Sequence, residues 1–200
     1  MMATAIAPAI THVRDFRAGQ PDTAPSSFVA IDFETANPSR SSPIQIGIVR
    51  VLDGVLGEPF TVPIMPPEGH RRFAPGNQRI HGLGPAYIHG APEWPAILER
   101  LIRFTTSVDG QRLELVAHNA AFEKSVIEKT SEACGLAIPD FRYFCTVKHA
   151  RKVLPHLSQH KLDVVARYYD LPAFAHHDAG ADALAGAQIT IRLAEDERPF

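Results

Sequence analysis

Apolar residues alternate with polar ones, or form short runs bounded by turn residues, in five stretches, which predicts β-strands. The clearest alternation is that of Ile44, Ile46 and Ile48, and the turn signal Asp53-Gly54 follows it. The predicted strands cover residues 28–34, 44–52, 59–65, 113–117 and about 141–146. The first three follow one another closely and are expected to form an antiparallel meander.

Apolar residues at helical spacing predict helices around and after the later strands, most plainly at Trp94, Leu98 and Leu101. The predicted helices begin near residue 94, after the N-cap Asn119, after residue 146, near Leu162 and near Asp178. Residues 66–90 are rich in Gly, Pro, His and Arg and are expected to form a long loop, often a functional feature in a compact domain. This order of elements predicts an α/β fold, a mixed sheet with helices on its faces.

A length of 200 residues and a hydrophobic fraction of 45 % suit one globular domain, expected at residues 26–200 after a mobile tail at residues 1–25. The net charge of −2 gives no global signal for nucleic acid. It does not exclude nucleic acid, because a basic stripe can lie beside an acidic metal site. Cys134 and Cys145 have no zinc or disulfide spacing, which fits a reducing cytoplasm, and neither a signal peptide nor a membrane-spanning run is apparent.

Two carboxylates, Asp32 and Glu34, end the apolar first strand. Side chains two apart in a strand point to the same face, so both project together from the carboxyl end of the strand. They repel each other unless a cation lies between them or one is protonated. Two unrelated acids at a solvated strand end are the alternative.

Two further clusters place an acid at the start of a helix. Glu123 falls in the first turn after the strand that ends at His118, where the helix dipole alone favours an acid. In the other cluster Asp178 is a plausible N-cap and Asp182 lies one turn further, among small residues where an unpaired charge is costly. A capping aspartate with surface histidines is the alternative there.

In this order the clusters resemble the DEDDh 3′→5′ exonucleases, the family of the DNA polymerase III epsilon subunit, ribonuclease T and oligoribonuclease. The motifs are Asp32-Phe33-Glu34-Thr35, His118-Asn119-Ala120-Ala121-Phe122-Glu123, and His177 followed five residues later by Asp182. The resemblance covers residues 26–194 and implies a three-layer, ribonuclease-H-like fold with a five-stranded mixed sheet. The family usually has Asp where this chain has Glu123, which bears on reaction rate and metal preference.

The resemblance implies hydrolysis at the 3′ end of single-stranded DNA or RNA with two Mg²⁺ or Mn²⁺ ions, releasing nucleoside 5′-monophosphates. Asp32 would be shared by both ions, Glu34 and Asp182 would complete the first ion's shell, and Glu123 would hold the second. His177 would take the proton of the attacking water, since an ordinary histidine pKa of about 6.5 suits a base near neutral pH.

Thr35, His81 and Asn119 match family positions at the terminal-nucleotide pocket, although Asn119 is equally a helix cap and His81 equally a loop histidine. Basic residues are candidate phosphate contacts, with a solvated helix face as the alternative. They are Arg71, Arg72, Arg79, Lys148, Arg151, Lys152 and Lys161.

Two other functions stay open at this stage: a nucleic-acid-binding or polymerase-associated module with weakened catalysis, and a phosphohydrolase acting on free nucleotides. The sequence also leaves open whether the substrate is DNA or RNA. A homodimer and association with a DNA polymerase are both candidate partnerships, whereas no membrane partner is expected.

Overall fold

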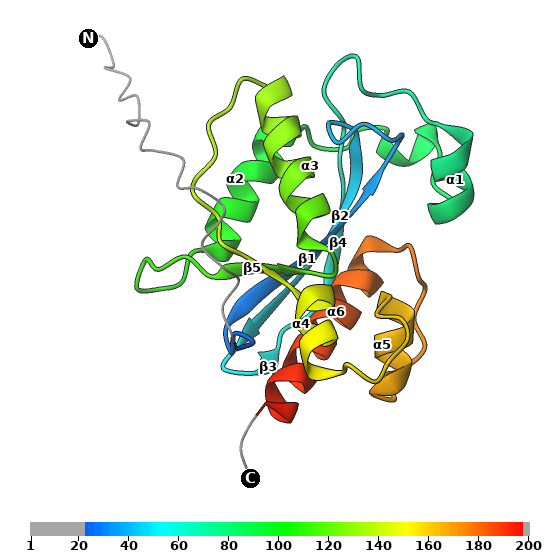
Figure 1. Cartoon of the computed structure of the whole chain (residues 1–200). Coiled ribbons are helices and arrows are strands. Elements are labelled where there is room, and N and C mark those ends of the chain that lie inside the picture. The colour runs from blue at the N-terminus through cyan, green and yellow to red at the C-terminus, as the bar shows by residue number, and fades with distance from the viewer. Residues whose placement is uncertain (1–22, 198–200) are drawn as a thin grey trace.

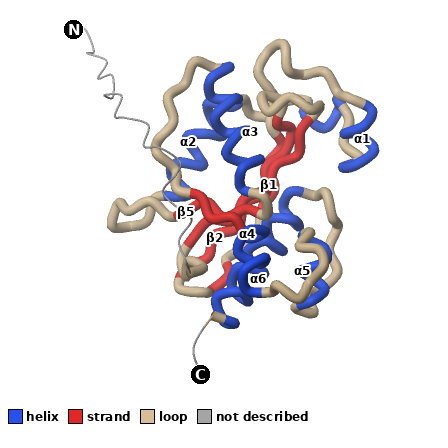
Figure 2. Tube along the Cα trace, viewed as in Figure 1, coloured by secondary structure: helices blue, strands red, loops and turns tan. Residues whose placement is uncertain are grey.

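A mixed β-sheet lies between two layers of helices, α2 and α3 on one face and α4, α5 and α6 on the other (Figures 1 and 2). The computed structural model describes residues 23–197, so most of the expected tail at residues 1–25 lies outside the described residues. The strands are β1 (Phe28–Thr35), β2 (Pro43–Leu52), β3 (Val55–Leu56), β4 (Phe60–Pro63), β5 (Glu114–Ala117) and β6 (Tyr143–Cys145). The helices are α1 (Pro75–His81), the 3₁₀ helix η1 (Pro85–Ile88), α2 (Trp94–Thr105), α3 (Ala120–Ala133), α4 (Thr146–Val153), α5 (Leu162–Tyr168) and α6 (Ala179–Asp196).

The strand order is β3-β2-β1-β5-β6, and β4 also pairs with β2. Strands β1 to β4 pair antiparallel, as the expected meander requires, whereas β5 and β6 join β1 in parallel. The two-residue strand β3 was not predicted. Strand β3 pairs with the end of β2, and β4 pairs with the beginning of β2. Because β3 and β4 lie along the same edge of β2, the sheet is five strands wide.

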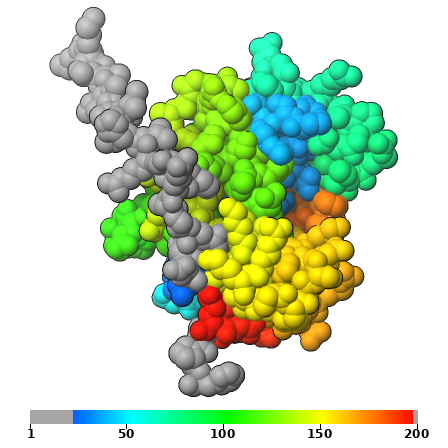
Figure 3. Space-filling model, in the orientation of Figure 1, coloured from blue at the N-terminus to red at the C-terminus, as the bar shows by residue number. Residues whose placement is uncertain are grey.

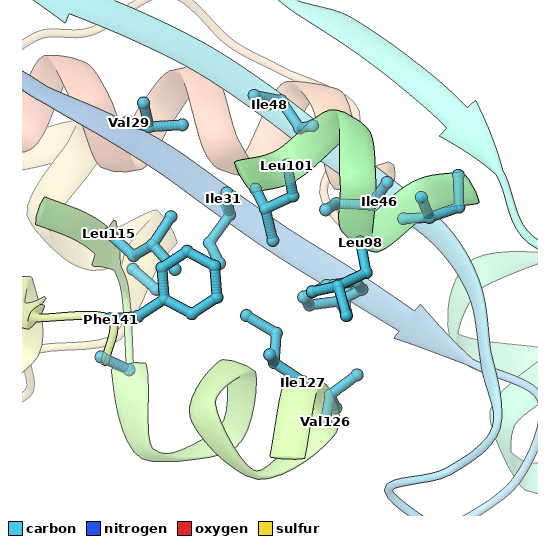
Figure 4. Packing of buried hydrophobic residues seen from close by; sticks show 14 of the residues in the cluster. Val29, Ile31, Ile46, Ile48, Leu98, Leu101, Leu115, Val126, Ile127 and Phe141 are labelled. Carbon is cyan, nitrogen blue, oxygen red and sulfur yellow. The ribbon is translucent and has the colours of Figure 1, made fainter. Parts of the chain in front are cut away.

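Alternation along β1 sorts its side chains between the two layers. Val29, Ile31 and Phe33 enter the core beneath α2 and α3, where they meet apolar residues of β2 and both helices (Figure 4). Phe28 and Ala30 pack on the opposite face, against α6. Asp32 and Glu34 continue this second register, so they project on the α6 side of the sheet.

Trp94 ties the α2–α3 layer to β1. Its side chain is fully buried, and its Nε1 donates a hydrogen bond to Ser131 Oγ of α3 (2.8 Å). Its ring centroid lies 6.1 Å from that of Phe33. Phe33 is therefore a core residue, and its packing directs the side chains of Asp32 and Glu34 to the opposite face of the sheet.

Two glycines allow the first turn of α6 to approach the sheet closely. A Cβ on Gly47 of β2 would lie 1.8 Å from the carbonyl oxygen of Ala179, and one on Gly180 would lie 2.1 Å from Thr61 Oγ1. Only residues without a side chain fit at these two positions. The close approach sets where Asp182 reaches the carboxyl end of β1.

The prediction of a continuous loop over residues 66–90 was wrong, because this region contains α1 and η1. Pro75 and Pro85 each begin a helix, where a fixed φ and a missing N–H are tolerated. Gly82 ends α1 with φ 75°, in the left-handed region.

The region around α1 lies beside the segment that follows β1 (Figure 3). The N–H of Ala74 donates to the carbonyl of Ala36 (2.8 Å), and Asn37 Nδ2 donates to the carbonyl of Arg72 (2.7 Å). Within residues 23–197, no helix is long and apolar enough to cross a bilayer.

Candidate functional site

The four acids of the motifs converge at the carboxyl ends of β1 and β5. A carboxylate oxygen of each of Asp32, Glu34 and Asp182 lies within 4.8 Å of the others. Glu123, in the first turn of α3, lines the same cavity of about 370 Å³. Residues more than 140 positions apart in the chain therefore meet at one site, as the resemblance of the three motifs to the exonuclease family implied.

Burial and mutual repulsion raise the pKa values of three of these carboxyls. Loss of hydration, with Glu123 and Asp182 nearby, holds the pKa of Asp32 well above its usual range. Burial, together with Asp182 and Asp178, raises the pKa of Glu34 to about 8. Burial also raises the pKa of Glu123 to about 8, although Arg40 opposes the shift. A site built this way favours a bound cation, which offsets the repulsion.

Glu123 carries the clearest sign of such a cation. Its side chain is 2 % exposed, and its Oε2 has no hydrogen-bond partner among the described residues. A buried carboxylate oxygen without a partner is costly unless something else satisfies it. The donor set is all oxygen, which suits Mg²⁺ or Mn²⁺, so the residues present fit divalent cations.

His177 is held in the turn that leads into α6. Its φ is 70°, its N–H donates to Asp182 Oδ2 (3.1 Å), and its Nδ1 lies 3.8 Å from Glu34 Oε1. Burial, with the neighbouring His176, lowers the pKa of His177. Asp178 accepts a hydrogen bond from the N–H of Ala181 (3.0 Å), which confirms the predicted N-cap of α6.

His176 lies at the site as well, although no role was predicted for it from the sequence. Its Nδ1 lies 2.9 Å from both carboxylate oxygens of Asp182, and its ring stacks on that of His177 at a centroid distance of 4.1 Å. Its position directly before His177 was the only available signal. Only the fold of the turn shows that it contacts Asp182.

Asn119 lines the cavity but does not cap α3 with its side chain, so that part of the helix-cap interpretation was wrong. Its backbone is left-handed, with φ 92° and ψ 51°, and its side chain makes no capping hydrogen bond. A non-glycine residue held in this region is strained and is often found at functional sites.

Thr35 and His81 lie together next to the cavity rather than in its lining. His81 Nε2 lies 3.2 Å from the Thr35 carbonyl oxygen, and Asn77 Nδ2 donates to the same oxygen (3.0 Å). Burial lowers the pKa of His81, and His177 adds to the effect. The ring of His81, at the end of α1, is therefore neutral near pH 7 and lies on the Thr35 side of the cavity.

A second cavity, of about 790 Å³, continues from the first and shares His118, Asn119 and Lys161 with it. Lys148 and Arg151 of α4 also line it, so three of the seven candidate phosphate contacts are gathered here. Among the other four, Arg71 pairs with Glu93 (3.4 Å) near α1. We call this second cavity the basic groove.

His118 forms the wall between the two cavities. Its Nε2 lies 2.8 Å from the His160 carbonyl oxygen, so it donates there, and its Nδ1 lies 2.7 Å from Thr146 Oγ1. Burial lowers the pKa of His118 to about 4, so the ring is neutral at pH 7. These two contacts connect the end of β5 to the start of α4 and to the segment before α5, and they could not be predicted from the sequence.

A family model described as an exonuclease family, RNase_T, matches residues 29–190. The chain belongs to this exonuclease family. The family predicted from the three motifs is thereby confirmed. Exonucleases of this kind generally use divalent metal ions, in keeping with the acidic cluster.

Two curated relatives are DNA polymerase III proteins. A PolC-type DNA polymerase III of Caldanaerobacter subterraneus subsp. tengcongensis is 27 % identical over 170 residues, covering 84 % of this chain but 12 % of the relative. A DNA polymerase III subunit epsilon of Aquifex aeolicus is 29 % identical over 176 residues, covering 85 % of this chain and 81 % of the relative. The chain thus spans a small part of the first relative and most of the second.

The nuclease domain of 3′hExo, a DEDDh family member bound to rAMP, is structurally similar to this chain. The TM-score is 0.72 at 15 % identity, covering 86 % of this chain and 93 % of that domain. At this identity the match concerns the fold, and it confirms the predicted ribonuclease-H-like fold.

Proposed function

We propose that this domain, expected to span residues 26–200, is a 3′→5′ exonuclease that removes nucleoside 5′-monophosphates from single-stranded DNA or RNA. The observation that carries the proposal is the convergence of four carboxylates around a cavity, with Glu123 Oε2 buried and unpartnered. The proposed reaction depends on two Mg²⁺ or Mn²⁺ ions.

Asp32 would be shared by both ions, with Glu34 and Asp182 completing the shell of the first and Glu123 holding the second. Bound there, the ions would supply an activated water and stabilise the leaving 3′ oxygen. The distances among Asp32, Glu34 and Asp182 support the grouping of these three, and the separate position of Glu123 supports a different role for it.

His177 would accept the proton of the attacking water. Its lowered pKa keeps the ring unprotonated near neutral pH, and 42 % of its side chain is exposed, so water reaches it. His176 would act as a positioning residue, because its contact with both oxygens of Asp182 restricts the rotation of that carboxylate.

The basic groove would hold the strand that leads to the terminal nucleotide. Lys148, Arg151 and Lys161 would contact backbone phosphates, which DNA and RNA have in common, so the groove would admit both. Asn119 would position the nucleotide where the two cavities meet, and Thr35 and His81 would support it from the α1 side.

The second candidate function is a binding or polymerase-associated module with weakened catalysis. The longer Glu123 at a position where the family usually has Asp favours it. The cellular setting we propose is the cytoplasm, which fits two cysteines without zinc or disulfide spacing. The candidate partnerships are a homodimer and association with a DNA polymerase.

Digestion of matched DNA and RNA oligonucleotides tests the proposal, with label at the 5′ or the 3′ end and with Mg²⁺, Mn²⁺ or chelator. The expected result is a ladder that shortens from the 3′ end only when metal is present. Metal-independent cleavage would contradict the metal assignment. Binding without cleavage would favour the second function, and cleavage of mononucleotides alone would favour a phosphohydrolase.

A further inference from the structure

A third cavity, of about 460 Å³, lies on the face of the sheet opposite to the one toward which Asp32 and Glu34 project. Its floor is formed by Ile46 and Ile48 of β2 and Val62 of β4. Its walls are Phe60 of β4 and Phe104 of α2, whose rings meet edge to face at 5.1 Å. We call it the Phe60–Phe104 groove.

Apolar surface continues outward from this groove beyond the end of α2. Phe60 is 38 % exposed, and Leu52 and Val55 are 46 % and 70 % exposed. The pairing of Leu52 with Val55, and of Ile48 with Phe60, puts all of them on one face of the sheet. Neighbouring exposed apolar side chains on a folded domain mark an interaction surface.

Three arginines surround the apolar floor. Arg50, Arg100 and Arg103 line the groove, and within the described part of the chain no acidic residue lines it. The Nε of Arg50 is buried and has no hydrogen-bond partner in the same part of the chain. Arg103 pairs with Glu99 in a solvent-exposed bridge (3.3 Å). Arg50 Nη2 donates to the Thr106 carbonyl oxygen (3.4 Å), and its guanidinium lies over the Phe104 ring (5.7 Å). Neither Arg50 nor Arg100 forms an ion pair among the described residues, so both can still meet a carboxylate.

We propose that the Phe60–Phe104 groove binds a short acidic segment of another protein. An apolar or aromatic side chain of that segment packs on the apolar floor, beside the edge-to-face pair of Phe60 and Phe104, and flanking carboxylates pair with Arg50 and Arg100. An arginine rim around an apolar floor complements this combination of negative charge and apolar side chain. Because the groove lies across the sheet from the acidic cluster, the partner leaves that cluster accessible.

Two other occupants fit the groove less well. Residues 1–22 of this chain carry two arginines and two aspartates, so they have no excess of negative charge. The phosphates of a nucleic acid would pair with the arginines, but a nucleic acid has no aliphatic side chain to cover the apolar floor. A second copy of the chain would need an acidic patch to meet the arginines.

Fluorescence anisotropy with labelled peptides of about twelve residues tests the proposal, using the full chain. One peptide carries a Leu-Phe pair flanked by Glu and Asp, a second has Lys in place of the acids, and a third has Ala in place of Leu-Phe. The first peptide is expected to bind at least about tenfold more tightly than the other two. Arg100→Glu is expected to abolish this preference, since it reverses an exposed charge without disturbing the core.

Arg192→Glu, a similar change on α6, is the matched control and should leave peptide binding unchanged. Phe60→Ser should weaken binding of the acidic peptide but not of the Ala peptide. Arg100→Glu and Phe60→Ser should both keep wild-type nuclease rates. Equal binding of all three peptides, or binding indifferent to Arg100→Glu, would overturn the proposal. So would displacement of the peptide by single-stranded DNA, or a dimer in sedimentation that Arg100→Glu dissociates.

Discussion

His177 and Asp182 are joined through the backbone: the N–H of His177 donates to Asp182 Oδ2 at 3.1 Å. One turn of chain, closed by the Asp178 cap, therefore fixes both the proposed base and a proposed metal ligand. Asp182 receives a second constraint from His176 at 2.9 Å. The geometry of the site thus depends on the start of α6 as a unit, and separate substitutions in this turn are expected to show non-additive effects.

Replacement of the proposed base should remove most of the activity without unfolding the chain. His177→Ala is expected to lower kcat by about 100-fold or more, the usual contribution of a general base, with an unchanged Tm. Single-turnover digestion of a 3′-labelled strand measures the rate. His156→Ala is the control, and full activity of His177→Ala would show that another group accepts the proton.

Shortening Glu123 should weaken metal binding. Glu123→Asp withdraws the carboxylate by one methylene from the position that α3 gives it. The Mg²⁺ concentration for half-maximal activity is then expected to rise about tenfold or more. The effect should be smaller with Mn²⁺, because Mg²⁺ tolerates little departure from octahedral geometry. An unchanged Mg²⁺ requirement would mean that Glu123 does not contact the second ion.

Stability of the metal-free chain should fall as pH rises. Glu34 and Glu123 have folded pKa values of about 8 against an ordinary 4.5, so between these values the folded state holds more protons than the unfolded state. The free energy of unfolding therefore decreases with pH across that interval. His118, with its pKa lowered to about 4, has the opposite effect below about pH 6.5.

Between about pH 7 and 8.5, the change in stability therefore comes from the carboxyls of the site, Glu34 and Glu123 among them, and not from His118. With chelator present, Tm is expected to drop by several degrees across this pH range, since about 1 kcal/mol corresponds to 2–4 °C for a chain of this size. Asp32→Asn, which removes a carboxyl whose own pKa is raised, should reduce the slope, and Mg²⁺ should stabilise the protein more at the upper end. A Tm that does not change with pH in the presence of chelator would contradict the raised pKa values of Glu34 and Glu123.

A methyl group on Gly47 should destabilise the fold and the site together. The new Cβ would lie 1.8 Å from the Ala179 carbonyl, so α6 must move outward. We expect Gly47→Ala to lose about 2 kcal/mol or more of stability, and its remaining folded fraction to have reduced nuclease activity. Gly186→Ala, in α6 with open space at its Cβ, is the matched control.

The effect on KM of removing the cationic side chains of the basic groove should depend on substrate length. Lys148→Ala with Arg151→Ala is expected to raise KM for a ten-nucleotide strand about tenfold and to lessen its salt dependence. KM for a dinucleotide, which ends near the first cavity, should change little. Lys129→Ala, an exposed lysine paired with Glu132, is the control. Equal effects on both substrates would place the two cations at the terminal nucleotide instead.

Sequence patterns were sufficient for the features that local periodicity determines. Alternation in β1 put Asp32 and Glu34 on one face, and the small residues around Asp182 indicated close packing, which Gly180 against Thr61 explains. The contact of His176 with Asp182 depends on how the turn before α6 folds onto β1. The left-handed backbone of Asn119 depends on the geometry between β5 and α3. Neither has a periodic signature in the sequence.

The α1 region was mistaken for a loop for a related reason. Its helix is seven residues long, contains no buried residue and therefore lacks an apolar stripe. Proline at its start and glycine after its end were the only local signals, and both residues are equally common in loops. Its hydrogen bonds to the segment after β1 hold it in place, and these are contacts between distant parts of the chain.

Trp94 is the single tryptophan of the chain, and its indole lies against Phe33, the residue between Asp32 and Glu34. If the end of β1 shifts when ions bind to Asp32 and Glu34, Phe33 shifts with it, and the surroundings of the indole on the opposite face of the sheet change. The protein therefore contains its own optical reporter, and its ultraviolet emission can follow ion uptake in solution without an attached dye.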